Sequence, residues 1–218
     1  MSVLDTEKIE SRAYQEVIAA SASDRNTLVV LPTGLGKTII AVMVASIKMK
    51  EDQKILMMAP TKPLASQHCQ TFREFLDVPK DQLKVMTGDT RPEERYDLWT
   101  DRRGFFATPQ VVENDLISGE VPMQDFSLVI FDEAHRATGD YSYVFINEKM
   151  DVQNLALTAS PGGSKEQIME VAENLDIDNF EVRTEDDPDV EPYIEEKEVN
   201  WINVELDDKF MEAKSKME

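Results

Sequence analysis

Six short apolar runs recur along the chain, and each is followed by a segment with helical spacing or composition. The runs are residues 27–31, 55–59, 83–86, 105–107, 128–131 and 155–157. The helical segments lie near residues 38–50, 63–76, 92–101, 109–118, 141–150 and 164–175. This alternation predicts an α/β fold with a mostly parallel sheet flanked by helices on both faces. Right-handed crossovers then place the loops that follow the strands along one edge, where ligands bind.

The first apolar run leads into a glycine-containing turn, Pro-Thr-Gly-Leu-Gly-Lys-Thr, at residues 32–38. Glycines let the backbone curl so that N–H groups point at phosphate oxygens, and the helix that follows adds its positive N-terminal end. Lys37 is expected to reach the β- and γ-phosphates of ATP, and Thr38 is expected to ligate Mg²⁺. The residues expected to contact the nucleotide here are Thr33, Gly34, Leu35, Gly36, Lys37 and Thr38.

This turn departs from the general phosphate-loop pattern, because Leu31 stands where the first glycine is expected. A chance Gly-Lys-Thr turn is the alternative interpretation. The apolar strand before the turn and the apolar helix after it argue for the phosphate loop.

The fifth apolar run ends in two carboxylates, Asp132 and Glu133, which are followed by Ala134 and His135. Adjacent acids at the end of a buried strand are costly unless they are paired, and a metal ion with a substrate water supplies a reason to keep them. Asp132 is expected to hold Mg²⁺ through a water, and Glu133 to orient and deprotonate the water that attacks the γ-phosphate. The alternative is an ordinary acidic helix cap. We interpret His68, in contrast to His135, as an ordinary helix residue.

The Asp-Glu-Ala-His box and the phosphate loop together resemble those of superfamily 2 DEAH-box helicases. Further short segments agree in order and spacing, namely residues 12–15, 59–67, 87–88, 107–110 and 157–162. Longer stretches are similar to archaeal Hef and its eukaryotic relative FANCM, namely residues 59–64, 107–116, 131–137, 141–145 and 157–162. The resemblance spans about residues 9–206.

The resemblance implies the first, ATP-binding RecA-like lobe of an ATP-dependent translocase that acts on branched or forked DNA. It also implies a second RecA-like lobe, an inserted helical domain and often a nuclease, which lie outside this chain. Because the second lobe supplies an arginine to the ATP site, we expect this lobe alone to bind nucleotide and hydrolyse it poorly.

The resemblance also implies roles for residues outside the phosphate loop. Arg12 and Gln15 would select adenine, or else merely begin a surface helix. The residues that would hold DNA backbone phosphates are Thr61, Lys62, Gly88, Thr108 and Gln110. The residues that would couple the ATP site to the second lobe are His135, Thr158 and Ser160. A solvated turn lysine is the alternative for Lys62, and a local cap is the alternative for Thr158 and Ser160.

The net charge of -20 argues, taken alone, against a nucleic-acid partner. It is explained either by an acidic surface suited to a salty cytoplasm or by a partner that is not a nucleic acid. Two other functions therefore stay open. One is an RNA-directed superfamily 2 ATPase. The other is a nucleotide-binding interaction module without turnover, against which the intact phosphate loop and acidic pair argue.

The character of the sequence changes after Asn179, which predicts a RecA-like domain over residues 1–180. The rest, 181–218, is expected to form an acidic extended connector to about residue 198, a strand over 199–206 and the start of a helix from Asp207. No apolar run approaches the length of a membrane span, and the single cysteine, Cys69, excludes an internal disulfide. A cytoplasmic location is the simplest expectation.

Overall fold

The computed structural model describes residues 3–49, 53–160 and 164–194. Its centre is a 7-stranded sheet in the order β3-β4-β2-β5-β6-β1-β7, and every strand pair in it is parallel. The strands are β1 (Thr27–Val30), β2 (Lys54–Met58), β3 (Leu83–Met86), β4 (Gly104–Ala107), β5 (Phe126–Asp132), β6 (Gln153–Thr158) and β7 (Asn179–Val182). The predicted parallel α/β sheet is therefore confirmed.

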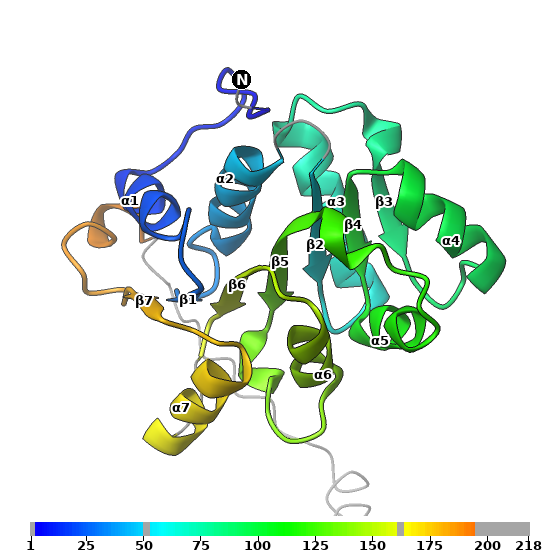
Figure 1. Ribbon diagram of the computed structural model, residues 1–218. Coiled ribbons are helices and arrows are strands. Elements are labelled where there is room, and N and C mark those ends of the chain that lie inside the picture. Colours follow the sequence, from blue (N-terminus) through cyan, green and yellow to red (C-terminus); the bar gives the residue numbers. More distant parts are fainter. Residues whose placement is uncertain (1–2, 50–52, 161–163, 195–218) are drawn as a thin grey trace, which may run out of the picture.

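Helices cover both faces of the sheet (Figure 1). One face carries α1 (Ala13–Ser21), α2 (Lys37–Lys48) and α3 (Lys62–Phe75). The other carries α4 (Pro92–Asp101), α5 (Pro109–Ile117), α6 (Ser142–Lys149) and α7 (Lys165–Asn174). Four 3-10 turns complete the described elements, namely η1 (Lys80–Gln82), η2 (Met123–Asp125), η3 (Ala134–Arg136) and η4 (Glu191–Tyr193).

The continuous apolar runs are explained by two separate cores, one on each face of the sheet. Successive strand residues point to opposite faces. Ile55 and Met57 of β2 thus pack into the core under α1, α2 and α3, whereas Leu56 and Met58 pack into the core under the other four helices. The middle strands are buried on both faces, and this is why they lack polar residues at alternate positions.

The edge strand β7 was not among the predicted strands. It pairs with β1, and its residues alternate between half-buried and exposed. An edge strand with one face exposed to solvent does not need a continuous apolar run, so the sequence of β7 resembles that of a connector. The predicted extended connector from Glu181 is wrong at its start, because Glu181 and Val182 belong to β7. The expected boundary at residue 180 thus falls inside a strand. The strand and helix expected after residue 198 lie outside the described residues.

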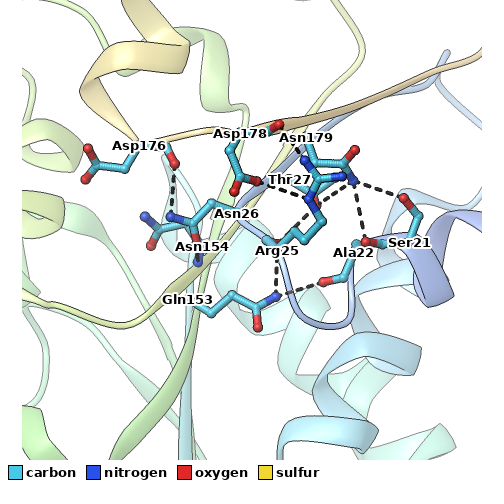
Figure 2. A network of polar contacts seen from close by, with 10 residues as sticks. All are labelled: Ser21, Ala22, Arg25, Asn26, Thr27, Gln153, Asn154, Asp176, Asp178 and Asn179. Atoms are coloured by element: carbon cyan, nitrogen blue, oxygen red, sulfur yellow. Dashed lines mark hydrogen bonds and ion pairs between the residues drawn. The ribbon is translucent and has the colours of Figure 1, made fainter.

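A network of polar side chains closes the amino edge of the sheet around β1, β6 and β7 (Figure 2). The Asn26 Oδ1 accepts a hydrogen bond from the backbone N–H of Asn154 at 2.9 Å. The Asn179 Nδ2 donates to Thr27 Oγ1 at 3.1 Å, and Gln153 Nε2 donates to Ala22 O at 2.8 Å. Side-chain amides here satisfy backbone groups and a hydroxyl, and they fix the positions at which these three strands begin.

Candidate nucleotide-binding site

The predicted phosphate loop lies between β1 and α2, at the carboxyl edge of the sheet. Gly34 and Gly36 have φ angles of +84° and +78°, which side-chain-bearing residues rarely adopt. A Cβ atom at Gly36 would also collide with the side chain of Gln15. Helix α2 begins at Lys37 and has no acidic residue in its first turn. The loop therefore curls around the positive end of a helix, which is the arrangement that binds phosphate.

Lys37 folds over this loop. Its Nζ donates to the carbonyl oxygens of Leu31 at 2.8 Å and Pro32 at 3.3 Å. Burial lowers the pKa of Lys37, while the nearby carboxylates of Glu133 and Asp132 act in the opposite direction. The ammonium group is thus held by backbone dipoles beside the acidic pair, at the place where a phosphate would meet both.

The acidic pair ends β5, and its two members differ in environment. Asp132 is 7% exposed, whereas Glu133 is partly exposed. Glu133 has a φ of 52°, a left-handed conformation that costs a non-glycine residue energy and tends to occur at functional sites. It precedes η3 without making a side-chain cap hydrogen bond, so the helix-cap alternative has no support.

Two side chains from opposite faces of the sheet hold Asp132. The phenol of Tyr143, on α6, donates to the backbone oxygen of Asp132 at 2.7 Å. Burial raises the pKa of Tyr143, so its hydroxyl stays protonated and available as a donor. From α3, His68 places Nε2 2.8 Å from Asp132 Oδ2. The expectation that His68 is an ordinary helix residue is therefore wrong.

A short chain of polar contacts links the acidic pair to the end of β6. The Thr158 hydroxyl donates its single proton to Ser160 O at 2.7 Å, so its oxygen accepts from His135 Nδ1 at 3.1 Å. The same ring nitrogen lies 3.3 Å from Glu133 Oε2. The structure thus places His135, Thr158 and Ser160 together beside Glu133, and the two bonds between Thr158 and Ser160 also match the local cap named as the alternative.

Arg12 and Gln15 lie at the start of α1, against the phosphate loop. Gln15 is 3% exposed, accepts from the Arg12 N–H at 2.9 Å and donates to Leu35 O at 3.2 Å. The hydroxyl of Tyr14 also donates to Leu35 O, at 2.7 Å. The alternative of a surface helix start is wrong for Gln15. The guanidinium of Arg12 lies 4.9 Å from the ring centroid of Tyr193, a residue that sequence reasoning missed.

The residues predicted to hold DNA phosphates lie along the same edge, beyond the ends of β2, β3 and β4. Thr61 precedes α3, Thr108 precedes α5, and Gly88 follows β3. Lys62 begins α3 and forms an ion pair with Asp89. These three strands are neighbours in the sheet. The phosphate loop follows β1, while Asp132 and Thr158 are the last residues of β5 and β6, and these three strands are also neighbours. The carboxyl edge is therefore divided into two adjoining halves.

A family model for DEAD/DEAH box helicases matches residues 11–168 of the chain. The chain belongs to this helicase family.

Individual helicases agree with this membership over nearly the whole chain. A Methanocaldococcus jannaschii protein, provisionally named an ATP-dependent RNA helicase, is 45% identical over 94% of this chain and 27% of its own length. The Drosophila melanogaster DEAD-box ATP-dependent DNA helicase Fancm is 39% identical over 94% of this chain and 15% of its own length. The crystal structure of the Pyrococcus furiosus Hef helicase domain matches with a TM-score of 0.87 and 45% identity, over 98% of this chain and 46% of that one.

The predicted resemblance to Hef and FANCM is thereby confirmed, and the sheet is that of a RecA-like helicase lobe. The chain spans less than half the length of each of these helicases. Within residues 3–49, 53–160 and 164–194, no helix has the length and apolar character needed to cross a membrane.

The residues at this helicase site suit Mg²⁺ in complex with a nucleotide. Mg²⁺ keeps several waters and uses one or two carboxylates together with substrate phosphates. Asp132 Oδ2 pairs with His68, and the described residues offer no hydrogen bond to Oδ1. Thr38 adds a hydroxyl at the start of α2. The described residues contain no cluster of three or more His, Cys, Asp or Glu side chains suited to a metal.

The position of His68 could have been recognised from the spacing of buried residues on α3. Ala65, His68, Cys69 and Phe72 recur at intervals of three and four, and all are buried. A histidine on the apolar stripe of a helix faces the sheet, where it needs a polar partner. The identity of that partner follows from strand order, because β2, which precedes α3, lies beside β5.

Proposed function

We propose that this chain is the ATP-binding lobe of an ATP-dependent DNA helicase or translocase that acts on branched or forked DNA. The observation that carries the proposal is structural: Lys37 follows β1, and Asp132 ends β5 with Glu133 next to it, at the same edge of the sheet, in a member of this helicase family. The resemblance to Hef and the named activity of Fancm support DNA as the partner.

In the proposed reaction the phosphate loop binds Mg-ATP. The backbone N–H groups of residues 33–38 hold the phosphates, and Lys37 leaves its carbonyl partners to contact the β- and γ-phosphates. Thr38 and Asp132 would hold Mg²⁺, Asp132 through a water, and the ion would supply positive charge against the charge that develops on the phosphate oxygens. Glu133 orients and deprotonates the attacking water, and its 3.3 Å contact with His135 extends to Thr158.

In the same proposal Arg12 and Gln15 recognise adenine, while the DNA backbone rests on the neighbouring half of the edge. Gln15 already uses its amide in two hydrogen bonds, so its contact with adenine draws on its remaining N–H and lone pair. The residues proposed to hold DNA phosphates are Thr61, Lys62, Gly88, Thr108 and Gln110. Lys62 would exchange its ion pair with Asp89 for a phosphate.

We further propose that the chain beyond β7 leads toward a second RecA-like lobe, which completes the ATP site. His135, Thr158 and Ser160 couple that site to the second lobe. The described part of the segment after β7 already packs back on this lobe, because Val190 is fully buried and Tyr193 contacts Tyr14 edge to face with 5.7 Å between ring centroids.

An RNA-directed ATPase is the second candidate, since the Methanocaldococcus jannaschii relative carries an RNA helicase name. The two candidates differ in the polymer that stimulates turnover. The test is steady-state ATP hydrolysis by protein that contains this chain with its second lobe. Single-stranded, duplex and forked DNA and duplex RNA are added in turn at two salt concentrations, with Lys37→Ala as the blank.

Stimulation by forked DNA above all other polymers is the expected result. Stimulation by duplex RNA alone would replace the proposal with the second candidate. Firm ATP binding without stimulation by any polymer would instead indicate an interaction module without turnover.

A further inference from the structure

His68 is a buried polar side chain whose contact was not expected from the sequence. It is 7% exposed, as is Asp132, and the two side chains meet at 2.8 Å between Nε2 and Oδ2. The contact joins elements that are far apart in the chain. It arises because α3 packs on β2, β3 and β4, and β2 pairs directly with β5, which ends in Asp132.

The hydrogen-bond partners of the ring indicate which atom donates. His68 Nδ1 is buried and finds no partner among the described residues. A carboxylate accepts hydrogen bonds and does not donate them, so the proton in this contact is on His68 Nε2, which donates to Asp132 Oδ2.

We infer that His68 is a positioning residue for Asp132, holding one carboxylate oxygen so that the other is presented to the nucleotide-bound magnesium and its water. This inference rests on the proposed ATP site. A side chain that orients a metal-binding group through a hydrogen bond is a recurring device in metal sites. Here the oriented group is the carboxylate, and the imidazole is the donor.

Asp132 is held from both faces of the sheet, which limits how it can move. Tyr143 of α6 fixes its backbone oxygen at 2.7 Å, and His68 of α3 fixes its side chain. The backbone contact sets the position of the residue, but it leaves the carboxylate able to rotate. His68 therefore contributes the part of the geometry that the strand and Tyr143 do not.

Three substitutions of His68 separate positioning from packing. His68→Leu removes the donor and replaces the imidazole with an apolar side chain of similar size. His68→Asn has a polar side chain that is too short to place a donor where Nε2 lies. This variant replaces His68→Leu in the experiment if the leucine variant does not fold. His68→Gln restores an N–H donor at a similar reach. Cys69→Ala is the matched control, because Cys69 is also buried on α3 and its Sγ lies 3.8 Å from Leu83 O rather than near Asp132.

The first readout is the Mg²⁺ concentration that gives half-maximal binding of a fluorescent ATP analogue. The second is the split between kcat and KM for ATP in the protein with both lobes, and thermal unfolding reports whether each variant is folded. We expect His68→Leu and His68→Asn to raise the Mg²⁺ midpoint and lower kcat by about 10–100-fold. His68→Gln should stay within about threefold of the parent, because it keeps a donor to the carboxylate. Cys69→Ala should leave both readouts unchanged.

Folded His68→Leu and His68→Asn variants with the parent Mg²⁺ midpoint and kcat would overturn the inference. So would a His68→Gln variant as impaired as His68→Leu. Lys37→Ala, measured alongside, distinguishes this failure from failure of the proposed function. If Lys37→Ala loses nucleotide binding while the His68 variants behave as the parent, the role of His68 alone is wrong. If Lys37→Ala binds Mg-nucleotide normally, the proposed ATP site is wrong.

Discussion

The polar side chains at the two edges of the sheet differ in what they bond to. At the amino edge, Asn154 Nδ2 donates to Asn147 Oδ1 at 2.6 Å and to Leu175 O at 2.9 Å. The amides of Asn26, Gln153 and Asn179 bond to backbone groups and to a hydroxyl (Figure 2). At the carboxyl edge, Lys37 rests on backbone carbonyls and Glu133 occupies a left-handed conformation. The first edge satisfies most of its own polar groups, with Asn154 Oδ1 as an exception, and stabilises the fold. The second holds its groups ready for a ligand, a use that commonly lowers stability.

The largest effect that tests this contrast is expected from Glu133→Gln at the carboxyl edge. The amide keeps the size of the side chain but cannot accept a proton from the attacking water. We expect Mg-ATP binding to persist and hydrolysis by the two-lobed protein to fall by about 10²–10⁴-fold. Glu148→Gln, on the exposed end of α6, removes the same charge elsewhere and should leave hydrolysis unchanged. Normal hydrolysis by Glu133→Gln would show that another group is the base.

At the amino edge the expected effect is on stability alone. Asn154→Ala deletes the donor to Asn147 and Leu175 and leaves two buried acceptors without it. Asn154 Oδ1 has no partner among the described residues, so its removal costs nothing further. We expect the free energy of unfolding to fall by about 2–3 kcal/mol, measured by urea denaturation, with unchanged nucleotide affinity of the folded protein.

The exposed Asn114 of α5 provides a control for the Asn154 substitution. Asn114→Ala should change the free energy of unfolding by less than about 0.5 kcal/mol. A loss of nucleotide affinity in folded Asn154→Ala would mean that the two edges are not independent.

The smallest expected effect is a change in the free energy of unfolding, and it concerns the residue with left-handed backbone at each edge. Glu133 has a φ of 52° and Asp176 a φ of 50°. Glycine relieves such strain but increases the freedom of the unfolded chain, so we expect Glu133→Gly to raise the free energy of unfolding by about 0.5–1 kcal/mol while abolishing hydrolysis. Asp176→Gly should not stabilise, because the Asp176 carboxylate accepts from Asn147 Nδ2 at 2.8 Å. Destabilisation by Glu133→Gly in thermal melts would contradict a strained, ligand-directed edge.

The central part of the fold was predictable because burial on both faces leaves a strong sequence signal. The middle strands β2 and β5 are apolar along most of their length, so the runs at 55–59 and 128–131 locate them to within two residues. Strand β7 has no such signal, because alternate residues of this strand are exposed to solvent. Its place next to β1 depends on backbone pairing and on Asn179, whose contacts lie more than 150 residues away.

The candidate site was predictable where its residues are adjacent in sequence. Glycines at 34 and 36 and the acids at 132 and 133 follow apolar runs directly, so local pattern is sufficient. The contact between His68 and Asp132 depends instead on which strands are neighbours, and the runs alone do not give that order.

Hydrogen–deuterium exchange with and without Mg-ATP compares the two edges in one measurement. If nucleotide binds as proposed, amide exchange should slow in residues 33–38 and 132–136 and stay unchanged at Asn26, Asn154 and Asn179. Lys37→Ala should remove that protection. Slowed exchange confined to the amino edge, or no change at the phosphate loop at saturating Mg-ATP, would contradict a nucleotide-binding carboxyl edge.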